Sequence, residues 1–450
     1  MERDLTTGSI GRNILKFSLP YFLSYFLQTL YGMADLFIIG QFNGVASTTA
    51  VSIGRQVMHM ITVMIVGIAM GTTVMIGKSV GAKQKKETSK IIGNTVSLFV
   101  CLSVVLTVVL LFFVHPIVRI MSTPQQAVEG TTAYLTICFA GIPLITAYNI
   151  ISSIFRGLGD SKSPMYFIAV ACGVNIVLDY VFIGGLHFGA SGAALGTTLA
   201  QTISVIVALI ALIAIRKKDT GISLKRSDLK PEGKTLKNIL GIGIPISLQD
   251  GFIQISFIVI TIIVNQRGLN DAAAVGIVEK IISFVFLVPS SMLSAVSAIA
   301  AQNIGAGKDE RAAKTLKYAV MISVTFGLCI AVIMQFISNS VVGIFTSDAV
   351  VIYMGSQYIR SYIWDCMIAG IHFSYSGYFC AYGFSGISFL HNALSIILVR
   401  IPGAFLASKY FADTLYPMGL AAPAGSLLSV VICVIAFLWM KKSFCEIVKV

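Results

Sequence analysis

The two halves of this 450-residue chain repeat one another. The motif Asn13-Ile14-Leu15, with Pro20 five positions after it, returns as Asn238-Ile239-Leu240 with Pro245, at an offset of 225 residues. Other pairs recur at an offset of 224, namely Gly81-Ala82 with Gly305-Ala306, Ile120 with Ile344, and Tyr134 with Tyr358. Self-similarity over half the length predicts two structurally related halves, a pattern that occurs in many secondary transporters.

The composition of the chain predicts an all-α integral membrane protein. It is 56% hydrophobic and only 11% charged, whereas soluble domains carry roughly 25% charged residues. About 20 helical residues are enough to cross the hydrocarbon core of a bilayer. We expect twelve transmembrane helices in two pseudo-symmetric six-helix lobes around a central cavity, with kinks available at Pro20, Pro143, Pro245 and Pro289. The predicted spans are 14–40, 46–77, 91–114, 127–155, 164–184, 190–215, 238–265, 272–304, 312–338, 349–381, 386–408 and 415–440.

The distribution of basic residues predicts the orientation. With both termini in the cytoplasm, 25 of the 32 Lys and Arg residues fall in interior loops and termini, and only Arg119, Arg267 and Lys409 fall in exterior loops. The other four, Arg55, Lys280, Arg360 and Arg400, lie in or near predicted spans. The positive-inside rule therefore favours cytoplasmic termini, and the net charge of +13 reflects topology and contact with lipid headgroups rather than nucleic-acid binding. We expect an N-terminal lobe at 1–215, a cytoplasmic linker at 216–237, a C-terminal lobe at 238–440 and a cytoplasmic tail at 441–450, with the lobes related as parallel repeats.

Acidic residues inside predicted spans of the first half form a candidate ion site. Asp35 shares a helical face with Ser24, Gln28 and Tyr31, and Asp179 lies one turn after Asn175. A charged side chain within the bilayer is costly, so each needs a partner, a cavity or a task. Two carboxylates, an amide oxygen and the hydroxyl of Thr197 or Thr198 could hold Na⁺ or share a proton, because like charges close together in low dielectric disfavour full ionisation. The alternative is a structural hydrogen-bond network.

The second half contains candidate substrate contacts. An acidic and aromatic stripe suits a cationic amphiphile through Coulomb attraction and cation–π contact. The alternatives are structural, with Glu279 paired to Lys280 or Asp271 at a helix start and His372 as a packing residue. The full set predicted to line a substrate cavity is Gln28, Tyr31, Asn149, Asp250, Gln254, Glu279, Tyr362, Asp365 and His372.

Motifs for enzymatic chemistry are not met. Gly157-Leu158-Gly159-Asp160 matches the Gly-x-Gly-Asp of intramembrane aspartyl proteases, but Asp160 falls in a predicted interior loop between Arg156 and Lys162. Gly305-Ala306-Gly307-Lys308 lacks the first glycine of a phosphate-binding loop and the Ser or Thr that follows its lysine. The eight cysteines occur singly, without zinc-ligand spacing. We expect a protein that is not an enzyme, has no cofactor, and draws its energy from an ion gradient.

Several motifs together carry a family resemblance over the whole chain. They are Leu19-Pro20 with Gln28-Thr29-Leu30-Tyr31 and Asp35, Arg156 to Pro164, Asn175 to Tyr180, Gly189 to Gly196, and Gln302 to Gly307. With them the chain resembles the multidrug and toxic compound extrusion (MATE) transporters of the bacterial DinF-like branch. One departure is Tyr382-Gly383-Phe384, which stands where the second repeat would carry the Gly-x-Gly-Asp turn.

The resemblance implies a function and a site. It implies two lobes around a V-shaped cavity, a place in the bacterial plasma membrane, and export of organic cations or amphiphilic drugs in exchange for H⁺ or Na⁺ by alternating access. It also implies that Asp35, Asn175, Asp179 and Thr197 form the ion site, with Na⁺ as the metal if one binds. We expect a monomer whose partners are its small-molecule substrate and the bilayer. The rival functions are a flippase for a lipid-linked substrate and an uncoupled channel or scaffold.

Overall fold

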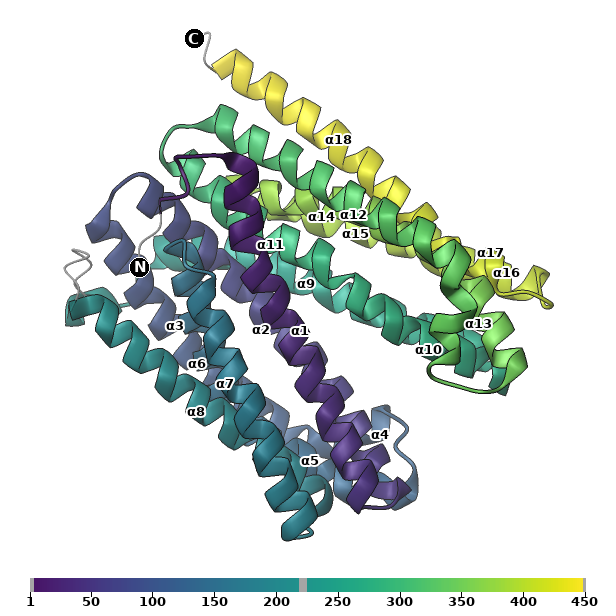
Figure 1. The fold of residues 1–450 in the computed structure, drawn as a ribbon. Helices are drawn as coiled ribbons and strands as arrows, with labels where there is room; N and C mark the ends of the chain where they lie inside the picture. Colours follow the sequence, from purple (N-terminus) through teal and green to yellow (C-terminus); the bar gives the residue numbers. More distant parts are fainter. Residues whose placement is uncertain (1–3, 218–224, 448–450) are drawn as a thin grey trace. The chain divides into compact units, whose positions relative to one another are not determined.

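The computed structural model describes residues 4–217 and 225–447, and most of these residues are helical (Figure 1). In the first half the helices are α1 (Ile10–Phe42), α2 (Val45–Gly81), α3 (Lys85–Phe112), α4 (Val114–Ile120), η1 (Gln125–Ala127), α5 (Val128–Ala140), α6 (Ile142–Gly157), α7 (Lys162–Asp179), η2 (Tyr180–Gly185), α8 (Gly189–Lys217) and η3 (Arg226–Leu229). In the second half they are α9 (Gly233–Asn265), α10 (Leu269–Val285), α11 (Leu287–Gly305), α12 (Asp309–Gly343), α13 (Ala349–Tyr362), α14 (Trp364–Tyr382), α15 (Ser385–Ser395), η4 (Ile396–Arg400), α16 (Ile401–Tyr410), α17 (Tyr416–Gly419) and α18 (Ala421–Ile447).

The structure confirms an all-α membrane protein. Ten helical segments among the described residues are long and apolar enough to cross a bilayer, and an eleventh results if the bent pair formed by η1 and α5 with α6 is counted as one span. The twelfth predicted span, 349–381, falls on α13 and α14, which are helical but rich in polar side chains. All twelve predicted stretches therefore lie on helices, while the number that cross the bilayer stays a prediction.

Prolines break two of the predicted spans and leave two others continuous. The helix before Pro143 ends at Ala140, and the segments on either side of this break meet at an angle of 48°. α10 ends at Val285, four residues before Pro289, as expected because a proline ring clashes with the carbonyl four residues earlier. α1 and α9, in contrast, run unbroken through Pro20 and Pro245.

The chain divides into two compact units. The first contains the described residues up to Thr7 together with Lys16–Gly243 and Ala301–Gly307, and the second contains Gly8–Leu15, Ile244–Ala300 and the residues from Lys308 onward. In the first unit α2 packs against α6 and α7 against α8, around buried aliphatic side chains. In the second unit α14 packs against α12 and α18, and α10 against α13.

The Gly-x-Gly-Asp motif is a helix cap. The carboxylate of Asp160 accepts hydrogen bonds from the backbone amides of Lys162 and Ser163, at 2.9 and 3.1 Å, and from the Ser163 hydroxyl at 2.6 Å. It thereby satisfies amides that the first turn of α7 leaves without helical partners. The structure thus gives Asp160 a structural task at the start of α7, outside the membrane-spanning part of that helix.

The described part of the predicted linker is docked on α3. The Glu232 carboxylate accepts a hydrogen bond from Lys90 at 2.7 Å. The backbone amide of Glu232 donates to Asn94 Oδ1 at 2.6 Å. Asn94 also donates to the carbonyl of Asp228, at 3.3 Å. Residues 218–224 of the predicted linker lie outside the described residues. The end of the linker is therefore fixed to the first unit.

We expect Glu232→Gln to loosen this docking. Hydrogen bonds from Lys90 and Thr235 hold the pKa of Glu232 below its usual value. The stabilisation from these bonds is therefore complete above the usual pKa of the carboxylate, and it is lost as the pH falls through the lowered pKa of the folded protein. The backbone amides of residues 225–235 should exchange hydrogen several-fold faster in the variant at pH 7. Glu310→Gln, which removes an exposed pair with Lys314, serves as the control and should leave that segment unchanged.

Candidate functional site

Asp35 is fully buried on α1 and pairs with an arginine of the next helix. The Arg55 Nη1 atom lies 2.6 Å from Asp35 Oδ2, and the Arg55 side chain is a quarter exposed. The guanidinium also lies 6.0 Å from the centre of the Tyr31 ring. The acidic residue on the first helix is therefore held in a charge pair that is itself largely removed from water.

Asp179 comes to the same place from α7. Its Oδ1 accepts a long hydrogen bond from Asn175 Nδ2 at 3.4 Å, one turn earlier on the helix. Asp179 packs so closely on α8 that a side chain at Gly196 would overlap its carboxylate. The neighbouring Thr197 donates to Asp35 Oδ2 at 3.5 Å, so the two carboxylates lie within interacting distance of each other, as their mutual influence also indicates.

The sequence left Thr197 and Thr198 as alternatives, and the structure distinguishes them. Thr198 donates to the carbonyl of Ala194 in its own helix at 2.8 Å, whereas Thr197 reaches Asp35. The structure thus brings together all four residues of the predicted ion site, which are Asp35, Asn175, Asp179 and Thr197.

Three oxygen atoms of this cluster are buried without a hydrogen-bond partner. They are Asp35 Oδ1, Asn175 Oδ1 and Asp179 Oδ2. Buried acceptors normally have a donor, and two carboxylates beside one guanidinium leave a net negative charge. A proton or a small monovalent cation would supply the missing partner. No group of three or more His, Cys, Asp or Glu side chains lies together in the described part of the chain, and oxygen ligands of this kind suit a hard cation such as Na⁺ better than a transition metal.

Three predicted substrate residues lie in the same unit. Gln28 and Tyr31 are half-buried on α1, where they interact with the side chains of Tyr148 and Gln201 respectively. Asn149 is buried on α6, and its amide donates to the carbonyl of Ile145 at 2.8 Å. These residues extend the polar face of α1 that contains Asp35, with Asn149 contributed by α6.

The second unit has a charge cluster of its own. Arg400 Nη2 donates to the Tyr362 hydroxyl at 2.5 Å, and its guanidinium stacks 4.8 Å from the centre of the Phe257 ring. Glu279 and Asp365 are the acidic groups that act on this guanidinium. One oxygen of each, Glu279 Oε1 and Asp365 Oδ1, is buried without a partner. The expectation that Glu279 pairs at a helix start with Asp271 is wrong, because Asp271 pairs with Arg267 at 2.7 Å.

The two clusters share local structural features. A π-helical turn follows Asp179 at η2, and another, η4, ends at Arg400. Such turns are rare and occur frequently at functional sites. Gly425 on α18 approaches Arg400 as Gly196 on α8 approaches Asp179. The next residue, Ser426, bonds to a carboxylate of its unit, as Thr197 does.

The remaining predicted residues of the second unit are His372, Asp250 and Gln254, and the charge of Arg400 acts on the His372 ring. His372 is buried, with its ring centre 5.4 Å from that of His391, whose Nε2 lies 2.9 Å from the Ser376 hydroxyl. Asp250 and Gln254 are half-buried on α9, and neither forms an ion pair with another described residue. His372 is thus one of a pair of packed imidazoles rather than an isolated histidine.

Sequence reasoning missed three functional-site candidates, Arg55, Arg400 and His391. The sequence placed both arginines in or near spans, where a permanent positive charge demands a nearby acid. Pairing each with an acid of its own half would have found Arg55 beside Asp35. No periodic pattern indicates His391, because it faces His372 from a helix that is separate in sequence.

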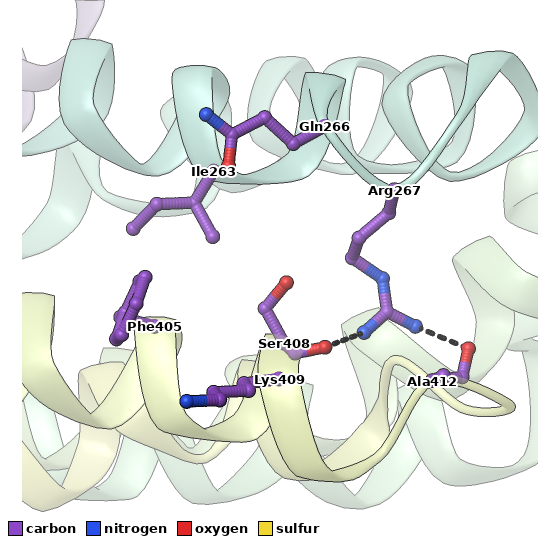
Figure 2. A pocket seen from close by; sticks show the side chains of 7 residues that line it. All are labelled: Ile263, Gln266, Arg267, Phe405, Ser408, Lys409 and Ala412. Carbon is purple, nitrogen blue, oxygen red and sulfur yellow. Dashed lines mark hydrogen bonds between the residues drawn. The ribbon is translucent and has the colours of Figure 1, made fainter.

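One cavity in the second unit has a structural arginine in its wall (Figure 2). The cavity measures about 370 Å³ and is lined by Ile263, Gln266, Arg267, Phe405, Ser408, Lys409 and Ala412. Arg267 donates to Asp271 and to four backbone carbonyls, those of Ser408, Phe411, Ala412 and Thr414. Its five N–H groups are therefore fully used in holding the segment between α16 and α17.

We expect Arg267→Gln to lower the stability of the protein while leaving the cluster of Asp35 and Asp179 unchanged. Charge-assisted hydrogen bonds contribute roughly 1.5–3 kcal/mol each, and water replaces part of this at an exposed loop, so a loss of about 2–4 kcal/mol is expected. Thermal unfolding in detergent measures it. Lys409→Gln removes the other cation of the cavity, whose Nζ lies 5.8 Å from the centre of the Tyr410 ring. An equal loss of stability in that variant would contradict this assignment.

Comparison with known proteins places these features in a family. The MatE family model matches the chain twice, at residues 20–181 and 245–406, so that both bounds are shifted by the same 225 residues. The probable multidrug resistance protein YoeA of Bacillus subtilis is 26% identical over 98% of this chain and 96% of its own length. The multidrug export protein MepA of Staphylococcus aureus is 25% identical over 90% of this chain and 89% of its own.

Solved structures share the fold. A multidrug resistance MATE family transporter of the MOP superfamily, in an outward-facing conformation, superposes with a TM-score of 0.90 over 100% of this chain and 99% of its own, at 24% identity. A MOP superfamily transporter from Pyrococcus furiosus, described as having a binding pocket of reversed polarity, gives a TM-score of 0.88 over 98% of this chain and 97% of its own, at 24% identity. The fold of the whole chain is thus that of these transporters.

Proposed function

Because this chain belongs to the MATE family of membrane transporters, we propose that it is a secondary active exporter of cationic or amphiphilic drugs, coupled to the entry of H⁺ or Na⁺. Two halves matched by one family model support the view that transport uses both repeats. The relatives YoeA and MepA are described as multidrug resistance and export proteins, which favours the same broad substrate class here. We place the protein in the bacterial plasma membrane, as a monomer with both termini cytoplasmic.

The observation that carries this proposal is the buried carboxylate pair Asp35 and Asp179 beside Arg55. In the ion-free state the pair and the guanidinium hold an excess negative charge, and two carboxylate oxygens have no donor. Binding of a proton or Na⁺, with Asn175 and Thr197 as further ligands, neutralises the excess. The free energy of burying the cluster then differs between the ion-loaded and ion-free states. A conformation that buries the cluster therefore binds the ion with a different affinity from one that exposes it, as a coupled cycle requires.

The cycle we propose is alternating access, in which the two repeats move relative to one another. An ion that neutralises the cluster favours one arrangement, and its release on the other side restores the first. A monovalent cation that enters across ~100 mV gains about 2.3 kcal/mol, and one unit of pH adds about 1.4 kcal/mol. Their sum supports a gradient of roughly 500-fold for an exported solute that carries no net charge, whereas a monocation that leaves against the same potential cancels the electrical part.

We propose substrate contacts in each unit separately, on the polar face of α1 in the first unit and at the Arg400 cluster in the second. Glu279 and Asp365 provide negative charge, and Tyr362, Phe257 and Tyr31 provide aromatic faces for an organic cation. His372, Asp250 and Gln254 are proposed only as peripheral members of this set.

Efflux from proteoliposomes under separately imposed pH and Na⁺ gradients tests the proposal. We expect ethidium export to follow one of the two gradients and to stop when that gradient is collapsed. A flippase would instead translocate headgroup-labelled lipid, and a channel or scaffold would show neither activity. The flippase would need basic residues in the cavity, for which the candidates are Arg55, Arg360 and Arg400. It is disfavoured because these already bond to Asp35, to the Ser338 hydroxyl and to the Tyr362 hydroxyl, respectively.

A further inference from the structure

A buried arginine of the first unit has no acidic partner. Arg156 lies in the last turn of α6 and is 8% exposed. Its guanidinium lies over the ring of Tyr21, with the Cζ atom 4.3 Å from the ring centre. Among the described residues no carboxylate forms an ion pair with it. A buried charge normally has a counter-charge, because removing an ion from water is costly.

Local interactions offset only part of that cost. The carbonyl groups at the C-terminal end of α6 favour a cation there, by a small amount. The contact with the Tyr21 ring adds an amount of the same order. The acid that is closest in sequence, Asp160, already caps α7 through both of its oxygens. The net positive charge of Arg156 therefore persists within the packed unit.

The second repeat shows that the fold does not require a cation at this place. α6 is followed by Gly159 with a φ of +88°, and α14 by Gly383 with a φ of +93°. Aligning these two left-handed turns puts Arg156 opposite Cys380, at the repeat offset of 224. Cys380 is buried and uncharged in the helix interface. The same helix end is thus built in the second unit without a charge.

A small cavity faces the guanidinium. It measures about 10 Å³ and is lined by Tyr21, Val66, Ala69, Met70, Thr73, Asn149, Ser153 and Arg156. A space of this size accommodates one water-sized atom. Its polar wall consists of the guanidinium together with hydroxyl and amide groups, and none of the lining residues is acidic. The electrostatic character of the cavity is that of an anion site.

We infer that Arg156 and this cavity bind one singly charged anionic atom, either a free halide ion or a carboxylate oxygen of the transported solute. The carboxylate source rests on the proposed export function, whereas the halide source does not. In either case the bound anion neutralises Arg156. If the solute supplies it, the site extends the substrate class from organic cations to zwitterions that carry a carboxylate.

The first experiment measures anion binding without transport. Thermal unfolding of the purified protein is followed while sodium gluconate is replaced by sodium chloride at constant ionic strength. A halide site predicts a midpoint that rises with chloride and levels off, a response that Arg156→Gln abolishes and Arg156→Lys retains in part. The control Lys162→Gln removes an exposed cation of the adjacent loop and should respond as the unchanged protein does.

The second experiment uses two dyes that differ only in their carboxyl group, rhodamine 123, a cationic methyl ester, and rhodamine 110, its free acid. If the solute supplies the anion, Arg156→Gln lowers rhodamine 110 efflux by about tenfold or more while rhodamine 123 efflux is retained, since a lost charge-assisted hydrogen bond costs roughly that factor. Loss of both effluxes in the unchanged protein would instead refute the proposed function.

The outcomes separate the two sources. A chloride response alone assigns the site to a free ion, and dye discrimination alone assigns it to the solute. If Arg156→Gln changes neither the chloride response nor the dye ratio, Arg156 is a packing residue and the inference is overturned. Where Arg156→Gln fails to fold, the Arg156→Lys variant carries the same comparison, because it keeps the charge but alters the geometry of the donors.

Discussion

Asp35→Asn is expected to abolish ion-driven efflux while leaving a folded, inserted protein. The amide keeps the shape and the hydrogen-bonding capacity of the side chain but cannot change its charge when an ion arrives. Coupling should fall by at least about tenfold, equal to about 1.4 kcal/mol of coupling free energy. The measurement is initial ethidium efflux in everted vesicles under an imposed ion gradient, normalised to the amount of protein in the membrane.

A matched control distinguishes coupling from general damage. Asp271→Asn changes an acid of the same type in the second unit, whose partner is the structural Arg267, and it should retain gradient-driven efflux. Full efflux by Asp35→Asn would exclude Asp35 as the coupling group. Asp179→Asn should give the same loss as Asp35→Asn, and the double variant should be no worse than either, because the two carboxylates act as one site.

Arg55→Gln is expected to be more destabilising than Asp35→Asn. It leaves Asp35 buried with its charge unpaired, and breaking a buried pair by removing one partner costs roughly 3–5 kcal/mol. Because the Arg55 side chain is a quarter exposed, we expect a loss of stability near the lower end of this range. A thermal unfolding midpoint in detergent, together with the yield of inserted protein, measures the effect.

The double variant separates the two tasks of this pair. Asp35→Asn together with Arg55→Gln removes both charges, so stability should return toward that of the unchanged protein while efflux stays absent. If the double variant is as unstable as Arg55→Gln alone, the guanidinium stabilises the unit through contacts other than Asp35, such as that with Tyr31 at 6.0 Å.

Much of this architecture could be predicted from sequence because hydrophobic length and charge placement follow directly from the bilayer. The twelve predicted apolar stretches all fall on helices, and the four residues of the proposed ion site lie together. Asp35 and Asp179 could be singled out because a charge within an apolar run has few structural explanations. The repeat motifs likewise indicated the duplication that the family model matches twice.

The rest required coordinates, because it depends on which side chains meet across helices. Nothing in the spacing of Arg55 indicates that its partner is Asp35 rather than another acid. Similarly, Glu279 was expected near its own helix start, yet it acts on Arg400 from another helix. The breaks near Pro143 and Pro289 could be anticipated, but the continuity of α1 and α9 through Pro20 and Pro245 could not, since proline permits either outcome within a packed bundle.

The widened turn after Asp179 has a consequence for how the fifth span could move. A turn with hydrogen bonds between residues five apart contains one more residue than an ordinary α-helical turn, and each residue of an α-helix accounts for about 100° of rotation. If η2 rewound into an α-helix, the chain beyond Gly185 would therefore rotate by roughly that angle relative to the Asp179 carboxylate, and the span would stay helical. Such a local rewinding would couple an event at the buried acid to a rotation of the loop that joins η2 to α8.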